Sequence, residues 1–209
     1  MKKILFIVVT AVVCFSTGCN THEHWEEGLP EMEHVYYVWF DKTNTYTDYL
    51  SYEIAQNGDA RWRFGSNATT GTWVATNEQW VATVPVRLSS ERVRSYDAVS
   101  YFWIFNLNGS SLTAGADYTV TLENGTVLTP NANGAYSLTW PQAKKGLQNV
   151  KIRRSATSPN GELRVNLYNP TNGTPVATDP STTTQNKTAE FEIRCMTHDN
   201  DRVTVTFTE

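Results

Sequence analysis

Apolar side chains recur at every second position through much of this chain from Val35 onward. In the stretch 80–88, Trp, Ala, Val, Val and Leu alternate with Val, Thr, Pro and Arg. The same period of two appears at 163–168, 190–195 and 203–207. A β-strand points successive side chains to opposite faces, so this period predicts strands with one buried and one solvated face. No window of eleven residues has a helical period.

Segment 99–107 (VSYFWIFNL) is apolar on both faces, which predicts a strand in the interior of a sheet. Asn-Gly pairs separate the predicted strands at residues 57–58, 108–109, 124–125, 133–134, 160–161 and 172–173. Asn-Gly favours the positive φ that tight hairpin turns require. We therefore expect residues 35–209 to form one all-β domain, an antiparallel β-sandwich.

The first eighteen residues have the composition of a secretory signal peptide. Lys2 and Lys3 precede a run, 4–15, in which only Thr10 is polar. This run is shorter than the roughly 20 apolar residues of a membrane-spanning helix. The stretch Ser16-Thr17-Gly18-Cys19 resembles the lipobox of bacterial lipoproteins of the Bacteroidetes type. The resemblance implies cleavage after residue 18 and acylation of Cys19, for example with palmitate; the alternative is an ordinary secretory signal.

Residues 19–34 are predicted to form an acidic tether. Segment 21–34 contains five acids and no Lys or Arg, and it has no period. It resembles the surface-export signal of the same lipoproteins, which implies an outer-membrane protein facing the cell surface. Loss of residues 1–18 changes the net charge from −4 to −6, which argues against binding to nucleic acid. His22 and His24 lack a third ligand and are not expected to bind metal.

Cys195 is the one cysteine besides the anchor that remains after cleavage, so no disulfide is expected. It shares an inward-facing row with Phe191 and Ile193. We therefore predict a buried, unreactive thiol.

Residues 81–201 resemble a Calx-β domain, an immunoglobulin-like sandwich. The resemblance is carried by LTAGADYTV (112–120), GELRVNLYNPTNG (161–173) and AEFEIRCMTHDND (189–201). It implies a calcium site at Asp117, Glu162, Asp199 and Asp201. Pro159 and Asn160 stand where the family has paired acids, and segment 198–201 also fits a plain polar turn. We therefore expect no cofactor, with calcium as the alternative.

No catalytic motif is present: the chain lacks G-x-S-x-G, H-E-x-x-H and a phosphate-binding glycine-rich loop. Of its histidines only His198 lies away from the tether region. We predict that the protein is not an enzyme. The alternative is a catalytic pair of carboxylates, as in glycosidases, from parts of the chain that are distant in sequence.

Aromatic residues are abundant, with seven Trp and ten Tyr. Segment 61–76 fits a hairpin with Trp62 and Trp73 on facing strands and Arg61 and Arg63 on the face opposite Trp62. This pattern predicts either an aromatic platform for sugars or an arginine pair for acidic sugars. Trp140, at a strand end, is a further surface candidate. Trp80 and Trp103 are assigned to the core, and core burial of Trp62 and Trp73 is the alternative.

Together these features predict a surface-anchored, non-catalytic lipoprotein that captures glycans for uptake. Its expected partners are the membrane, through the lipid, and a polysaccharide or an outer-membrane uptake complex. The alternative is an adhesion or structural subunit that pairs with a partner protein through an exposed edge strand.

Overall fold

The structure, a computed structural model, describes residues 35–41, 49–65, 70–89, 93–168, 192–195 and 201–209. Within these residues the chain consists of strands and one 3-10 turn, η1 (Pro141–Ala143), and it contains no α-helix. The predicted all-β class is therefore confirmed. The predicted signal peptide, the predicted tether and Cys19 lie outside the described residues.

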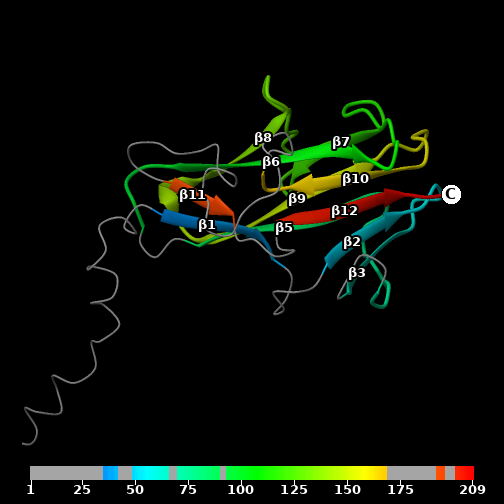
Figure 1. Cartoon of the computed structure of the whole chain (residues 1–209), viewed down its shortest axis with the longest axis horizontal. Coiled ribbons are helices and arrows are strands. Elements are labelled where there is room, and N and C mark those ends of the chain that lie inside the picture. The colour runs from blue at the N-terminus through cyan, green and yellow to red at the C-terminus, as the bar shows by residue number, and fades with distance from the viewer. Residues whose placement is uncertain (1–34, 42–48, 66–69, 90–92, 169–191, 196–200) are drawn as a thin grey trace, which may run out of the picture. The chain divides into compact units, whose positions relative to one another are not determined.

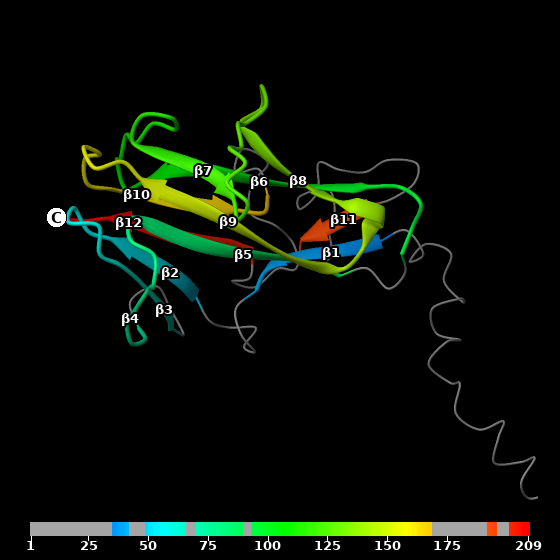
Figure 2. The ribbon, with the colours of Figure 1, turned by 180° about the vertical axis from the view of Figure 1, so that it is seen from behind.

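The strands form two sheets that pack face to face (Figures 1 and 2). In the five-stranded sheet the order is β11 (Glu192–Cys195), β1 (Val35–Phe40), β5 (Val81–Ser89), β9 (Gly146–Arg154) and β7 (Tyr118–Leu122). In the seven-stranded sheet the order is β4 (Val74–Ala75), β3 (Ala60–Gly65), β2 (Tyr49–Ile54), β12 (Arg202–Phe207), β10 (Gly161–Asn166), β6 (Ala98–Leu107) and β8 (Ala135–Trp140). β6 pairs on both sides, as predicted for segment 99–107.

One apolar core joins the inner faces of the sheets. Val84 and Val86 of β5 lie in it together with Leu163 of β10 and Val205 of β12. Each of these side chains is at most 1 % exposed, while its neighbours along the strand are more exposed. The period of two thus assigns the buried face correctly in these strands, and Trp103 is also buried as predicted.

The sandwich is not antiparallel throughout. β12 pairs with β2 in parallel, from Val203 opposite Leu50 to Phe207 opposite Ile54. The seven-stranded sheet is therefore mixed, and the antiparallel prediction is wrong at this pair. A two-residue hairpin forces neighbouring strands to be antiparallel, but β2 and β12 are far apart in sequence and no such hairpin joins them.

Trp80 does not belong to the core row of β5. It lies in the turn before the strand with φ of 66°, and it is only half-buried. Its indole lies against Gly58, where a Cβ would be 2.3 Å from Nε1. The backbone N–H of Trp80 donates to the Gly58 carbonyl. The buried row begins at Ala82, because the left-handed residue before the strand breaks the alternation.

Arg154 ties the two sheets together at the end of β9. Its side chain is buried, and its guanidinium donates to the carbonyls of Ile54 (2.7 Å), Thr208 (2.6 Å) and Ser158 (2.9 Å). Asn160 Oδ1 accepts a fourth bond at 3.2 Å. Burial lowers the pKa of Arg154 below its ordinary value. Its donors satisfy backbone carbonyls from β2, from the C-terminus and from the turn before β10.

Replacing Arg154 with Met should lower the free energy of unfolding by about 3 kcal/mol or more, because the carbonyls of Thr208 and Ser158 lose their donor and each buried, unpaired acceptor costs about 1–3 kcal/mol. Denaturant unfolding measures the loss. Arg153→Met is the control, since the Arg153 side chain is 51 % exposed and bonds only at the surface. The free energy of unfolding of Arg153→Met should fall by no more than about 1 kcal/mol. Equal losses in both variants would contradict the role assigned to Arg154.

Candidate functional site

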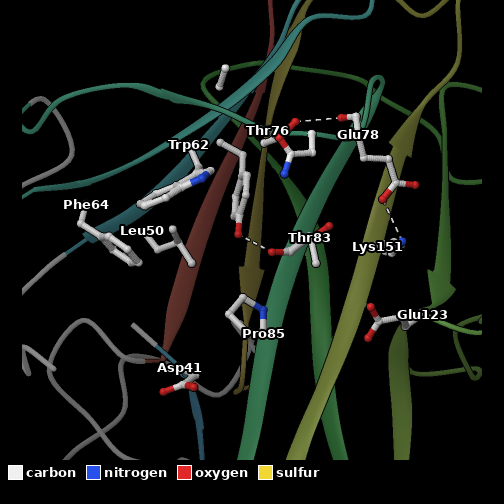
Figure 3. A pocket seen from close by; sticks show the side chains of 13 residues that line it. Asp41, Leu50, Trp62, Phe64, Thr76, Glu78, Thr83, Pro85, Glu123 and Lys151 are labelled. Atoms are coloured by element: carbon white, nitrogen blue, oxygen red, sulfur yellow. Dashed lines mark hydrogen bonds and ion pairs between the residues drawn. The ribbon is translucent and has the colours of Figure 1, made fainter. Parts of the chain in front are cut away.

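A groove opens where β5 extends past the end of β1. β1 pairs with β5 as far as Phe40 opposite Val86, so within the described residues no strand pairs with 81–85 of β5 on that side. The β2–β3–β4 ribbon of the other sheet faces this free edge (Figure 3). The groove has a volume of about 520 Å³. This volume lies within the range found for small-ligand sites.

Two aromatic rings from β3 form one wall of the groove. Trp62 and Phe64 lie two residues apart and therefore share a face of the strand. Their ring centroids are 4.8 Å apart with an edge-to-face angle of 66°, and both side chains are half-buried. Leu50 and Tyr52 of β2 pair with Phe64 and Trp62 and extend the apolar wall toward the core.

Tyr52 closes the bottom of the groove. Its hydroxyl donates to the carbonyl of Thr83, which joins β2 of one sheet to β5 of the other. Burial raises the pKa of the Tyr52 hydroxyl well above its usual range. The hydroxyl therefore keeps its proton and donates throughout the physiological pH range.

The opposite wall is polar and comes from the outer face of the five-stranded sheet. Its acids are Asp41, Glu78 and Glu123, and its base is Lys151. Each acid is bonded: Asp41 to Arg87, Glu78 to Lys151 (2.8 Å) and Arg153 (3.1 Å), and Glu123 to Asn149 (2.9 Å). Exposed ion pairs contribute little stability, about 0–1 kcal/mol. Their effect here is to fix the positions of the groups along the wall.

Of the predicted sugar-binding residues, the groove contains only Trp62. Trp73 lies on the other face of β3, where Arg63 and Arg61 lie 4.4 Å and 5.0 Å from its ring centroid. The predicted pairing of the two tryptophans is wrong, because β4 places Val74 opposite Trp62. Trp73 is the next residue along, so its side chain points to the opposite face.

Trp140 is not a surface residue. It is 2 % exposed, and its Nε1 donates to Ser100 Oγ at 2.8 Å. It is the last residue of β8 and continues the inward row of Tyr136 and Leu138. The position of Trp140 beside Pro141 had suggested an exposed ring, but the alternation of β8 buries it.

The structure does not bring the predicted calcium ligands together. Glu162 lies at the start of β10, whereas the Asp201 carbonyl accepts the N–H of Leu167 beyond the other end. Five residues of strand separate these positions by about 16 Å. Asp117 accepts the N–H of Thr113 in a turn, and Glu162 accepts from Asn108. Asp199 lies outside the described residues, and those residues contain no cluster of three potential metal-ligating side chains.

Cys195 is buried, as predicted, and Ile193, two residues earlier in β11, is also buried. Burial raises the pKa of its thiol well above the ordinary value, so the thiol stays protonated and unreactive. Phe191 lies outside the described residues. Within the described part of the chain, no helix is long and apolar enough to cross a membrane.

Sequence reasoning missed most of the groove. Phe64 was detectable, since it follows Trp62 at the strand period. Pro85 was a second signal: a proline inside a predicted strand marks a position without a neighbour on its N–H side. Nothing in the sequence indicated Asp41, Glu123 or Lys151, which reach the groove from three separate parts of the fold.

No protein-family model matches this chain, and no curated protein matches it.

Removing the Tyr52 hydroxyl with Tyr52→Phe should lower the free energy of unfolding by about 1 kcal/mol, because one hydrogen bond between the sheets is lost. Tyr101→Phe is the control, since Tyr101 is half-buried and its hydroxyl has no partner within the described residues. It should change stability by less than about 0.5 kcal/mol. Denaturant unfolding compares the two, and equal stabilities would show that the bond to Thr83 contributes nothing.

Proposed function

We propose that this protein is a non-catalytic glycan-binding lipoprotein and that the groove between β3 and β5 holds the sugar. The observation that carries the proposal is the half-buried Trp62 and Phe64 pair facing a polar wall. Aromatic faces pack against the C–H faces of sugar rings, and polar groups opposite them bond the hydroxyls. The volume of about 520 Å³ has room for a short stretch of a chain of sugars.

Binding is favoured over hydrolysis by the state of the acids. A glycosidase needs one carboxyl group that gives a proton and a second that acts as base or nucleophile. In the groove, Asp41 and Glu78 are engaged by basic side chains and Glu123 by the amide of Asn149. These partners hold the carboxylates in place, which suits hydrogen bonding to sugar hydroxyls.

The anchor belongs to the same proposal. Acylated Cys19 would hold the protein on the outer membrane, facing the cell surface, with residues 19–34 as the tether. More than one acyl chain makes such anchoring stable. A polysaccharide and an outer-membrane uptake complex are the proposed partners. The proposal also includes that the sandwich is of the Calx-β or immunoglobulin-like type.

The edge strands favour glycan capture over strand pairing with another protein. At β8 the backbone of Ala135 bonds Asn131, and the Thr139 carbonyl accepts from Gln148. At β7 the carbonyl of Val120 accepts from Leu128. β4 has two residues and β11 has four. A partner strand needs a longer, open edge, so the described edges offer little support for that alternative.

Trp62→Ala should weaken glycan binding by about 2 kcal/mol or more, as loss of a central aromatic contact does. Trp73→Ala is a matched control, because Trp73 is also half-buried and lies on the other face of β3. A glycan array run on the full chain in detergent identifies the ligand, and titration calorimetry compares the variants.

The proposal predicts weakened binding for Trp62→Ala and unchanged binding for Trp73→Ala, with both variants folded by near-ultraviolet circular dichroism. If only Trp73→Ala weakened binding, the ligand site would instead be the face of β3 that carries Arg61 and Arg63. Absence of binding to every glycan on the array would overturn the proposed function.

A further inference from the structure

We infer that the sugar-binding surface extends beyond the groove to Trp39, and that its ligand is a stretch of a long, neutral, straight polysaccharide. Trp39 lies on the outer face of the five-stranded sheet, the face that also forms the polar wall of the groove. This inference rests on the proposed function and names the class of glycan.

The side chain of Trp39 points away from the core. Its neighbours in β1, Val38 and Phe40, are at most 2 % exposed and belong to the core, so Trp39 points to the outer face. The side chain is half-buried, and it makes no hydrogen bond or ring contact within the described residues. Its ring face and its indole N–H can therefore contact a ligand.

The strand register places Trp39 one row of side chains beyond the groove. Asp41 and Pro85 line the groove (Figure 3), and the Asp41 N–H donates to the Pro85 carbonyl. Trp39 precedes Asp41 by two residues and lies opposite Arg87, which in turn lies opposite Leu147. Two residues along a strand span about 7 Å, which separates the two rows. A chain of sugars that leaves the groove along β5 therefore crosses Arg87 and reaches Trp39.

Arg87 connects the groove to the row that contains Trp39. Its guanidinium bonds the groove acid Asp41, and its side chain is 40 % exposed. Leu147, on the other side of Arg87 from Trp39, is 47 % exposed. This row therefore presents an aromatic ring, a charged donor and an apolar side chain at one surface. A sugar ring matches this combination, because it has apolar C–H faces and polar hydroxyls at its edge.

The charges along this path favour a neutral glycan. Each acid is already bonded to a side-chain donor: Asp41 to Arg87, Glu78 to Lys151 and Arg153, and Glu123 to Asn149. The three acids are thus matched by three bases, so an ionised sugar would lose hydration without an excess of opposite charge to replace it. Sugar hydroxyls both donate and accept, so they can bond the carboxylates and the guanidinium without adding charge.

The shape of the path favours a straight chain. The groove wall and the row of Trp39 belong to one sheet face, on which β1 and β5 run side by side from Tyr37 to Phe40. A β-1,4-linked backbone is an extended ribbon that can stay in contact with such a face. An α-1,4-linked backbone coils and leaves the face after a few sugars. We therefore assign β-1,4-linked glycans to this surface.

Cello-oligosaccharides and β-1,4-linked manno-oligosaccharides of three and six sugars test the inference on the full chain in detergent. In at least one series the six-sugar chain should bind at least about tenfold more tightly than the three-sugar chain, because the longer chain adds the contact with Trp39. Titration calorimetry measures the affinities. Equal affinities for the two lengths would overturn the inference and leave a glycan-binding function standing.

The choice of probes also separates the inference from the proposed function. Failure of both series to bind while the glycan array shows another ligand would overturn the inference alone. Absence of binding to every glycan on the array would overturn the inference together with the proposed function.

Trp39→Ala should weaken binding of the six-sugar chain at least about tenfold and leave binding of the three-sugar chain unchanged. Trp62→Ala should weaken both, because Trp62 lines the groove itself. Trp73→Ala is the control and should change neither, since Trp73 belongs to the other sheet. Equal losses at both lengths in Trp39→Ala, or no loss at either length, would overturn the assignment to Trp39.

A measurement on the unaltered protein covers the case in which Trp39→Ala fails to fold. Oxidation of Trp39 by hydroxyl radicals, followed by mass spectrometry, should fall when the six-sugar chain saturates the protein, because the bound sugar covers the ring. The three-sugar chain should leave this oxidation unchanged. Unchanged oxidation of Trp39 in the complex with the six-sugar chain would overturn the inference.

Discussion

The difference in length between β1 and β5 is the constraint on which the candidate site depends. β5 continues for five residues, 81–85, beyond its pairing with β1. Within the described residues this edge has no neighbouring strand, so its backbone donors and acceptors need other partners. Here Asp41 and Tyr52 each take one carbonyl of β5, those of Pro85 and Thr83. The ribbon that carries Tyr52 also brings Trp62 and Phe64 to the same place.

Polar side chains tie the sheets together at this end of the molecule. Tyr52 links β2 to β5, and Arg154 links β9 to β2 and to the C-terminal residues. Apolar packing is not directional, but these bonds specify where one sheet lies over the other. The groove therefore has a fixed width, since its two walls stand on strands that are bonded to each other. A rigid scaffold of this kind favours a preformed ligand site.

The sequence predicted the strands better than it predicted the site. Alternation at 82–88, 163–167 and 203–207 assigned the buried face correctly, because a half-buried strand imposes the period of two on its residues. The same reasoning failed for Trp80, because its left-handed backbone before β5 breaks the alternation. Trp140 was predicted from its place at a strand end beside Pro141, whereas the alternation of β8 buries it. Trp62 was found, but Trp73 was placed on the wrong face.

The groove could not be derived from periodicity, because it depends on which strands are neighbours. The parallel pairing of β2 with β12 carries the β2–β3 hairpin to the free edge of β5, and no local pattern encodes that pairing. Glu123 and Lys151 likewise meet the hairpin only through the order of strands in the two sheets. Local sequence specifies strands and turns, whereas the site is made by contacts between distant segments.

Oxidative footprinting of the tryptophans tests most directly whether the groove is the ligand site. The full chain is exposed to hydroxyl radicals with and without its tightest-binding glycan, and mass spectrometry measures the oxidation of each ring. Trp62 and Trp73 are both half-buried, so both rings should react in the free protein. We predict that the glycan protects Trp62 and leaves Trp73 unchanged. Protection of Trp73 with continued oxidation of Trp62 would contradict the account.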